Sequence, residues 1–367
     1  MKIYALTDII ITKGVTHMYP ERLKKLVSVI PANATLIFSP ENLYYFSGFT
    51  GGEGMLYIDK SRLLLFTDSR YTVQAKEQAP DFEVIDTARL SVSQFLKDSG
   101  DKAYGFEDDY MTFSNYAGLK RVAQKSVFTP VSSHIDKLRM IKDAHELSLI
   151  KKAAQIADSA YSYILDKIAV GKTEREISLD LEYYMLTHGA DGLAFETISA
   201  SGVRSCMPHG VATSKVIESG DFLTLDFGCK YKGYCSDMTR TVVVGKASEK
   251  QKEIYATVLE AQKNALSAIR SGELAQAVDE AARGVIENAG YGKNFGHGLG
   301  HSLGLKVHES PSCSPRSVDI LTENMMMTVE PGIYIDGYGG VRTEDLVCVT
   351  ADGYENFTTS EKELIEI

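Results

Sequence analysis

Three of the chain's eight histidines, His297, His301 and His308, lie in the glycine-rich stretch FGHGLGHSLGLKVHESP at 295–311. Two histidines four residues apart on a helix would present both imidazoles to one metal ion. Glycines interleave with these histidines, however, and each glycine in a helix interior costs about 1 kcal/mol relative to alanine. The stretch is therefore predicted to be extended or looping, with backbone close to a neighbouring segment. Phosphate binding is disfavoured, because no Lys-Ser or Lys-Thr pair follows and no GxGxxG opens a helix.

Acidic residues interrupt strand-like patterns elsewhere in the chain. In DFLTLDFGCKYKGYCSDMTRTVVVG, Asp226 alternates with apolar residues, so it points to the face opposite their side chains. Aspartate is depleted in strand interiors, and its presence there needs a reason. A tight turn at 231–232 or 232–233 would place Asp237 either directly opposite Asp226 or one diagonal away on the same face. Like charges at such positions repel unless something neutralises them.

A second predicted hairpin repeats this arrangement. Glu330 follows MMMTV, and Glu344 lies in VRTEDLV after a DGYGG turn. Clustered carboxylates are tolerated in a folded interior only when they are paired or coordinate metal. Ligation by oxygen atoms and one imidazole, from His301, suits manganese, cobalt or iron(II) better than a metal selected by thiolates. Two-metal sites of this kind activate water and polarise a carbonyl, which is the chemistry of peptide hydrolysis.

Composition narrows the class of protein. A length of 367 residues favours two domains. The net charge is -10 and the basic residues are scattered, which argues against a nucleic-acid partner. The opening MKIYALTDIIITKGVTH is a poor signal peptide, and no stretch approaches the roughly 18 apolar residues of a membrane span. We therefore expect no membrane association.

The cysteines indicate a reducing compartment. Their number is odd and no CxxC spacing occurs, so neither a disulfide framework nor a thiolate zinc site is predicted. A cytoplasmic location follows. Cys206 precedes His209 by three residues, but a small buried hydrophobic residue is a commoner role for it than a nucleophile.

The element pattern changes along the chain. From 34 to about 130, short apolar runs alternate with helical patterns, which predicts a small α/β domain. The mixed polar segment PVSSHIDKLRMIKD marks the boundary, giving domains at 18–131 and 132–367. Residues 1–17 are interpreted as an extra tail before the first helix.

The second domain is predicted to be α+β with antiparallel strands. Three of its helices begin at capping-box sequences, in which a side chain at the helix start and an acid or amide three residues later satisfy each other's backbone N–H groups. The pairs are Asp143 with Glu146, Thr173 with Glu176, and Ser248 with Gln251. The second helix should stop at Gly189 and the third near Gly272.

Five motifs together resemble those of a known family. LTLDFG, YCSDMTRT, GHGLGHSLGLKVHESP, MTVEPGIYI and VRTEDLV occur in the order found in the pita-bread metallopeptidases, the fold of methionine aminopeptidases, aminopeptidase P and prolidase. PENLYYFSGFTGGEGMLYI and LFTDSRYTVQA resemble the amino-terminal domain of the aminopeptidase P, prolidase and creatinase branch, which methionine aminopeptidases generally lack. The resemblance implies a C-terminal pita-bread catalytic domain preceded by a smaller α/β creatinase-type domain.

The resemblance also implies roles for individual residues. Asp237 and Glu344 would be shared between two metal ions, and Glu330 would also handle the proton of the attacking water. The implied metal ligands are Asp226, Asp237, His301, Glu330 and Glu344.

Other residues would contact the substrate. His209, in MPHG, and His308 would stabilise the charge that develops on the scissile carbonyl oxygen. His297 belongs to the HGLGH form of the proline-specific branch and would line the proline pocket with Tyr334 and Arg342.

The implied function is a cytoplasmic Xaa-Pro aminopeptidase, which hydrolyses the bond between an N-terminal residue and proline. It would use two divalent ions, with Mn²⁺ favoured over Co²⁺, Zn²⁺ or Fe²⁺, and would form a homodimer. The alternative is an Xaa-Pro dipeptidase, or prolidase, restricted to dipeptides, and a methionine aminopeptidase is a more distant one. A metal-free binding scaffold of the same fold would lack ligands, but no ligand position departs from the pattern.

Overall fold

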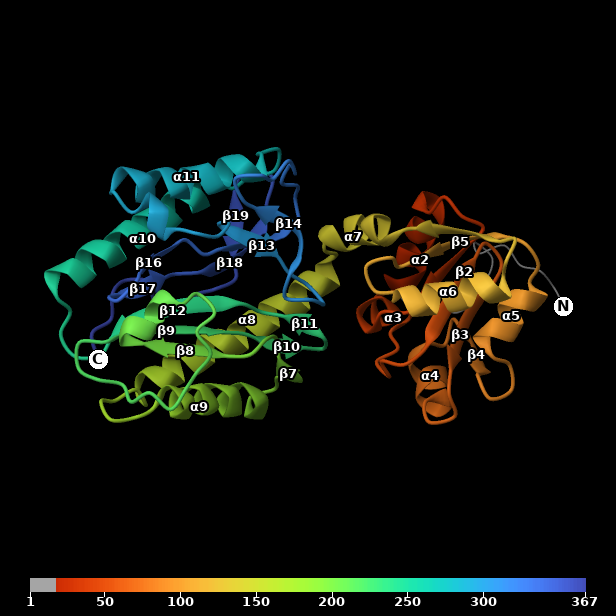
Figure 1. Cartoon of the computed structure of the whole chain (residues 1–367), viewed down its shortest axis with the longest axis horizontal. Coiled ribbons are helices and arrows are strands. Elements are labelled where there is room, and N and C mark those ends of the chain that lie inside the picture. The colour runs from red at the N-terminus through yellow and green to blue at the C-terminus, as the bar shows by residue number, and fades with distance from the viewer. Residues whose placement is uncertain (1–17) are drawn as a thin grey trace. The chain divides into compact units, whose positions relative to one another are not determined.

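The computed structural model describes residues 18–367, in which the chain forms two compact units that meet in sequence at Leu138 and Arg139 (Figure 1). The predicted tail at 1–17 lies outside the described residues. Among the helices of 18–367, none is long and apolar enough to span a membrane.

The first unit is built on a mixed sheet of the order β4-β3-β2-β1-β5-β6. Its strands are β1 (Ala34–Ile37), β2 (Met55–Asp59), β3 (Leu63–Thr67), β4 (Glu83–Asp86), β5 (Ala103–Phe106) and β6 (Val127–Pro130). Its helices are α2 (Met18–Val29), α3 (Pro40–Ser47), α4 (Thr72–Gln78), α5 (Val92–Asp98), α6 (Phe113–Val122) and α7 (Ser132–Met140), the last of which crosses into the second unit. The alternation expected from the sequence is confirmed.

Helix α3 was not predicted, although its signals are present in the sequence. The Ser39 side chain accepts from the Asn42 N–H, proline occupies the first helical position, and Gly48 ends the helix in the left-handed conformation. The GFTGGEG run that follows forms the loop between α3 and β2. Helix α7 likewise lies within a segment that was interpreted only as a boundary.

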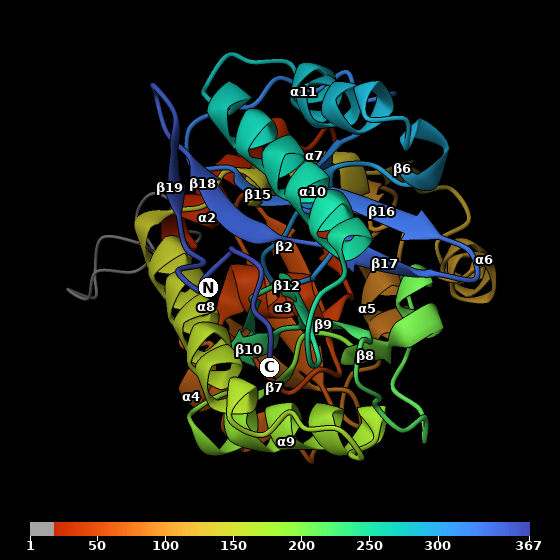
Figure 2. The same ribbon diagram turned by 90° about the vertical axis from the view of Figure 1, so that its left-hand side faces the viewer.

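The second unit places strands between two helix pairs. Figure 2 shows α10 (Glu249–Ala268) and α11 (Ala275–Asn288) along one side of the strands, with α8 (Ala144–Leu165) and α9 (Glu174–Thr187) along the other. One apolar core lies under α10 and α11, and a second lies between α8, α9 and the strand pair nearest them. All three predicted capping boxes are formed, at α8, α9 and α10. Helix α10 ends at Ala268, before the predicted Gly272.

The remaining elements of the second unit are short strands and turns. The strands are β7 (Gly192–Leu193), β8 (Ile198–Ser201), β9 (Phe222–Phe227), β10 (Cys229–Tyr231), β11 (Tyr234–Cys235), β12 (Met238–Val243), β13 (Gly300–Ser302), β14 (Glu309–Cys313), β15 (Met326–Val329), β16 (Gly332–Ile335), β17 (Gly339–Arg342), β18 (Asp345–Val349) and β19 (Tyr354–Asn356). The 3₁₀ turns are η1 (Gly202–Cys206) and η2 (Gly292–Asn294).

The first acidic hairpin has the diagonal register, one of the two that were predicted. Lys232 and Gly233 form the turn, with φ of 47° and 80°, as a two-residue type I′ turn requires. Asp226 lies opposite Thr239. Asp237, two residues before Thr239, therefore lies one diagonal from Asp226 on the same face of the strands.

The second acidic hairpin brings its two glutamates face to face. Strand β15 pairs with β18, and β16 pairs with β17, in one continuous register. Val329 lies opposite Asp345 and Gly332 lies opposite Arg342. Glu330 is consequently opposite Glu344, at the step between the two ladders.

Candidate metal centre and substrate pocket

The glycine-rich stretch is extended at His301 and loops around His297 and His308, in keeping with the prediction of an extended or looping segment. Strand β13 contains His301, and a Cβ placed on Gly300 would lie 2.0 Å from the backbone oxygen of Thr328. Only glycine allows this close approach of two backbones. The contact places His301 beside strand β15, which ends one residue before Glu330. The His301 N–H donates to the Thr328 hydroxyl oxygen.

A cavity of about 610 Å³ in the second unit gathers the predicted site residues. Residues from the first acidic hairpin, the second acidic hairpin and the glycine-rich stretch all line it. The predicted residues in its wall are His209, Asp226, Asp237, His297, His301, His308, Glu330, Arg342 and Glu344. Tyr334 lies behind this wall and is hydrogen-bonded to two of them.

The predicted ligand atoms converge on one point. His301 Nε2 lies 3.3 Å from Glu330 Oε1 and 3.7 Å from Asp237 Oδ2. One ligand atom each from Asp237, His301 and Glu344 lie within 4.8 Å of one another. His301 Nδ1 is 3.1 Å from the Ser302 carbonyl oxygen, which can only accept, so Nδ1 carries the proton and Nε2 offers its lone pair to the cluster.

Hydrogen bonds hold one oxygen of Asp226 and one of Glu344, and leave the other oxygen of each without a partner in the described part of the chain. Asp226 Oδ2 accepts from Arg342 at 2.6 Å, and Glu344 Oε2 accepts from the Thr239 hydroxyl at 2.7 Å. Asp226 Oδ1 and Glu344 Oε1 are buried without a hydrogen-bond partner among the described residues. Buried, unpaired carboxylate oxygens are costly unless a cation occupies the space between them. The donor set therefore fits divalent metal ions.

The electrostatics of the cluster lead to the same conclusion. Burial, followed by the neighbouring carboxylates, raises the pKa of Asp237 and of Glu344 well above its ordinary value. Burial also raises the pKa of Glu330 to about 7. Burial lowers the pKa of His301, which keeps its imidazole neutral, as ligation requires. Without cations the cluster holds protons in place of charge, and metal ions would displace those protons.

The predicted substrate residues form one hydrogen-bonded chain. Arg342 Nη1 donates to the Tyr334 hydroxyl at 2.8 Å, and that hydroxyl lies 2.8 Å from His297 Nε2. His297 Nδ1 lies 2.8 Å from the Gly298 carbonyl oxygen, so Nδ1 carries the proton and Nε2 accepts from the tyrosine. Burial lowers the pKa of His297 to about 4. The hydrogen-bonded series from Arg342 through Tyr334 to His297 therefore presents a neutral imidazole to the cavity.

The two histidines expected at the carbonyl lie on different segments of the wall. The His308 ring packs edge to face against His301, with centroids 4.5 Å apart, and burial lowers its pKa. His209 follows η1, and Arg342 Nη1 donates to the Pro208 carbonyl oxygen beside it at 3.3 Å. This hydrogen bond links the loop that carries His209 to Arg342 in the cavity wall.

Residues that support the candidate ligands were not predicted from the sequence. Thr239 holds Glu344 and also accepts from Arg342 Nε at 3.0 Å, while the Thr328 hydroxyl donates to Glu330 Oε1 at 3.0 Å. Both threonines lie two residues from a ligand along a strand, which puts them on the ligand's face. That spacing was the available signal. All five cysteines are free thiols, and Cys206 is not in the cavity wall.

Comparisons with known proteins agree with this geometry. Residues 148–351 match Metallopeptidase family M24, and residues 21–141 match the Creatinase/Prolidase N-terminal domain. The Xaa-Pro dipeptidase of Pyrococcus furiosus is 41% identical over 350 residues, which are 94% of this chain and 99% of that protein.

Solved structures give close superpositions. An Xaa-Pro dipeptidase from Bacillus anthracis has a TM-score of 0.91 at 44% identity, covering 95% of this chain and 100% of that chain. An X-Pro aminopeptidase from Thermotoga maritima has a TM-score of 0.87 at 39% identity, covering 94% of this chain and 100% of that one.

Fold, site and comparisons define a metal-dependent peptidase of the pita-bread fold. The chain belongs to metallopeptidase family M24 and carries the creatinase-type N-terminal domain of the proline-specific branch. The predicted fold class and family are thereby confirmed.

Proposed function

We propose that this chain is a metal-dependent Xaa-Pro dipeptidase, which hydrolyses a dipeptide whose second residue is proline. The supporting observation is the convergence of four carboxylates and His301 in one cavity, with two buried carboxylate oxygens left without donors. The relatives named as Xaa-Pro dipeptidases favour this activity over the aminopeptidase that the sequence motifs alone suggested.

The residues have distinct tasks in this proposal. Two divalent ions held by Asp226, Asp237, His301, Glu330 and Glu344 would polarise the scissile carbonyl and supply an activated water. His209 and His308 donate to the carbonyl oxygen as negative charge develops on it. Glu330 takes up the proton of the water as general base.

Substrate length separates this activity from its nearest alternative. An Xaa-Pro aminopeptidase would accept longer peptides, and the Thermotoga maritima relative is named for that activity. The purified chain should release free amino acid from Xaa-Pro dipeptides with Mn²⁺, and much more slowly from Xaa-Pro tripeptides. Equal rates on tripeptides would favour the aminopeptidase, and faster cleavage of Met-Ala peptides would contradict proline specificity altogether. Parallel assays with Co²⁺, Zn²⁺ and Fe²⁺ would test the preference for manganese.

Proline preference is expected to depend on His297. Replacing it with alanine removes the imidazole from the cavity wall and the acceptor of the Tyr334 hydroxyl, but no ligand carboxylate. His297→Ala should therefore keep its metals and lose at least tenfold in kcat/KM on Xaa-Pro substrates, about 1.4 kcal/mol of transition-state stabilisation. Metal analysis and dipeptide kinetics on the same preparation measure both effects.

The outcome has a clear control. Tyr334→Phe keeps the ring and removes only the hydroxyl that links Arg342 to His297. A smaller loss in the same direction is expected from it. Unchanged Xaa-Pro turnover in His297→Ala, or a parallel loss of metal, would assign the preference for proline to other residues.

A cytoplasmic location and a homodimer also belong to the proposal. The first rests on the odd number of cysteines and the absence of CxxC spacing, and the second on the family resemblance. Light scattering of the purified chain measures the second directly.

A further inference from the structure

The second acidic hairpin loses its regular pairing at the two glutamates. Pro331 has no N–H to donate. The Glu330 N–H donates to the Leu299 carbonyl at 2.9 Å, and the Glu344 N–H donates to the Thr239 carbonyl at 3.0 Å. Both N–H groups therefore bond to segments outside the hairpin. Ladder hydrogen bonds do not fix the spacing of the strands at this step.

One side chain from another element bridges this gap. Gln262 projects from α10 and is fully buried. Its Nε2 lies 3.2 Å from the Val329 carbonyl oxygen and 3.2 Å from the Thr343 carbonyl oxygen. Val329 directly precedes Glu330 and Thr343 directly precedes Glu344. A single amide group therefore joins the backbones on which the two opposed carboxylates stand.

This arrangement leaves an acceptor unsatisfied. Gln262 Oε1 is buried and has no hydrogen-bond partner among the described residues. An unpaired buried polar group costs about 1–3 kcal/mol. An apolar side chain of similar size would avoid that cost but would remove the donor of the Val329 and Thr343 carbonyl oxygens. The two donated hydrogen bonds therefore account for a glutamine at this position.

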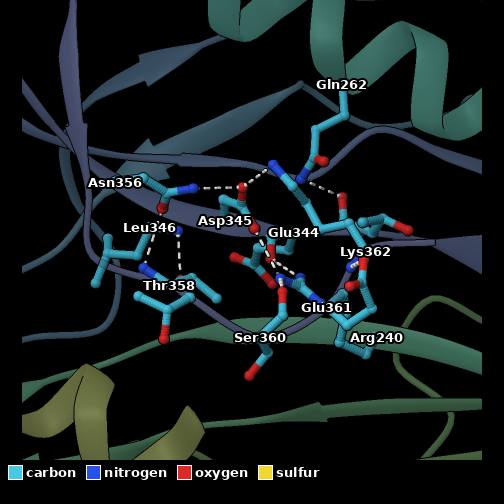
Figure 3. A network of polar contacts seen from close by, with 12 residues as sticks. Arg240, Gln262, Glu344, Asp345, Leu346, Asn356, Thr358, Ser360, Glu361 and Lys362 are labelled. Carbon is cyan, nitrogen blue, oxygen red and sulfur yellow. Dashed lines mark hydrogen bonds and ion pairs between the residues drawn. The ribbon is translucent and has the colours of Figure 1, made fainter.

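The other side of Glu344 is held by Arg240. The Arg240 guanidinium donates to the Glu344 carbonyl and, at 3.0 Å, to the Thr239 carbonyl, and it pairs with Asp345 at 2.9 Å. Figure 3 shows Gln262 reaching down from α10 toward the strand of Glu344, with Arg240 below that strand. Hydrogen bonds from Gln262 and Arg240 therefore hold the backbone at Thr343 and Glu344 from two sides, which restricts the position of the Glu344 carboxylate.

We propose that Gln262 is a positioning residue for the metal ligands Glu330 and Glu344, and that it sets their separation by joining the Val329 and Thr343 carbonyls. The inference rests on the metal site of the proposed function. Because metal affinity depends on ligand spacing, loss of this link should weaken metal binding more than it weakens the fold.

Two matched variants test this role in the full-length chain. Gln262→Met keeps the length of the side chain and removes both donors. Gln251→Met is the control, because Gln251 is also buried on α10 and donates to a distant carbonyl, that of Gly220, at 2.8 Å. Mn²⁺ affinity is measured by calorimetry on chelator-treated protein, and the fold is followed by thermal unfolding of the metal-free form.

Gln262→Met should bind Mn²⁺ at least tenfold more weakly at one site or both. Its kcat should recover largely at saturating Mn²⁺, with KM for the dipeptide little changed. Gln251→Met should unfold at a lower temperature but bind Mn²⁺ like the wild type. Wild-type affinity in Gln262→Met, or equal weakening in both variants, would overturn the inference.

Gln262→Asn tests the same role if Gln262→Met does not fold. Gln262→Asn keeps a buried amide but is one methylene shorter, so it cannot donate to both carbonyls, and it should show the same weakening. Wild-type affinity in Gln262→Asn would also overturn the inference. Absence of Mn²⁺ binding by the wild-type chain would instead contradict the proposed function.

Discussion

Asp237→Ala is expected to lose bound metal and peptidase activity together. Asp237 lies one diagonal from Asp226, and one of its oxygens is 3.7 Å from His301 Nε2. It belongs to the cluster whose ligand atoms lie within 4.8 Å of one another. A ligand in this central position would serve both ions, so its loss should empty both sites. Activity should fall to the background of the assay, as it should when the wild-type protein is treated with a chelator.

The measurement is metal content per chain, compared with dipeptide turnover before and after addition of Mn²⁺. Asp59→Ala is the matched control, because Asp59 is a buried carboxylate paired with Arg62 in the first unit. That variant should be less stable yet keep its metal. Full activity in chelator-treated wild-type protein, or in Asp237→Ala, would exclude a role for metal in the reaction.

Glu330→Gln is expected to reduce turnover by about 10²–10⁴-fold, the usual contribution of a general acid or base. Glutamine keeps the size of the side chain but cannot accept the proton of the attacking water. The native carboxylate is held in the cavity wall, where the Thr328 hydroxyl donates to its Oε1 at 3.0 Å. Its oxygen also lies 3.3 Å from His301 Nε2, so we expect weaker binding of at least one ion.

Rate and metal content must therefore be measured together at saturating Mn²⁺. A turnover defect that persists when metal content is restored assigns proton transfer to Glu330. A loss smaller than about tenfold with full metal occupancy would move that role to another residue.

Local chemistry in the sequence was enough to predict several elements. Each capping box, such as Asp143 with Glu146, needs only residues three apart in the chain. The sequence narrowed the turn of the first hairpin to two positions, and the structure places it at Lys232 and Gly233, which both have positive φ. The set of candidate ligands was implied by the resemblance of five motifs to those of the pita-bread metallopeptidases.

The sequence could not decide how these residues meet. The opposition of Glu330 and Glu344 follows from a register that continues across an interrupted ladder. The bond between Arg342 and Asp226 joins residues 116 positions apart, and no local pattern encodes it. Gln262 lies in a helix whose sequence shows only ordinary amphipathic spacing.

The amino-acid sequence by itself predicted the family, three helix starts and the candidate metal ligands, because those depend on side-chain type and short spacing. Only the tertiary structure decided which carboxylate oxygens are left unpaired and which side chains contact the backbone beside the candidate ligands. Burial and hydrogen bonding to distant segments set those properties, and the same burial raises the pKa of Glu330 and lowers that of His297. Such effects come into existence only when the chain closes around the cavity.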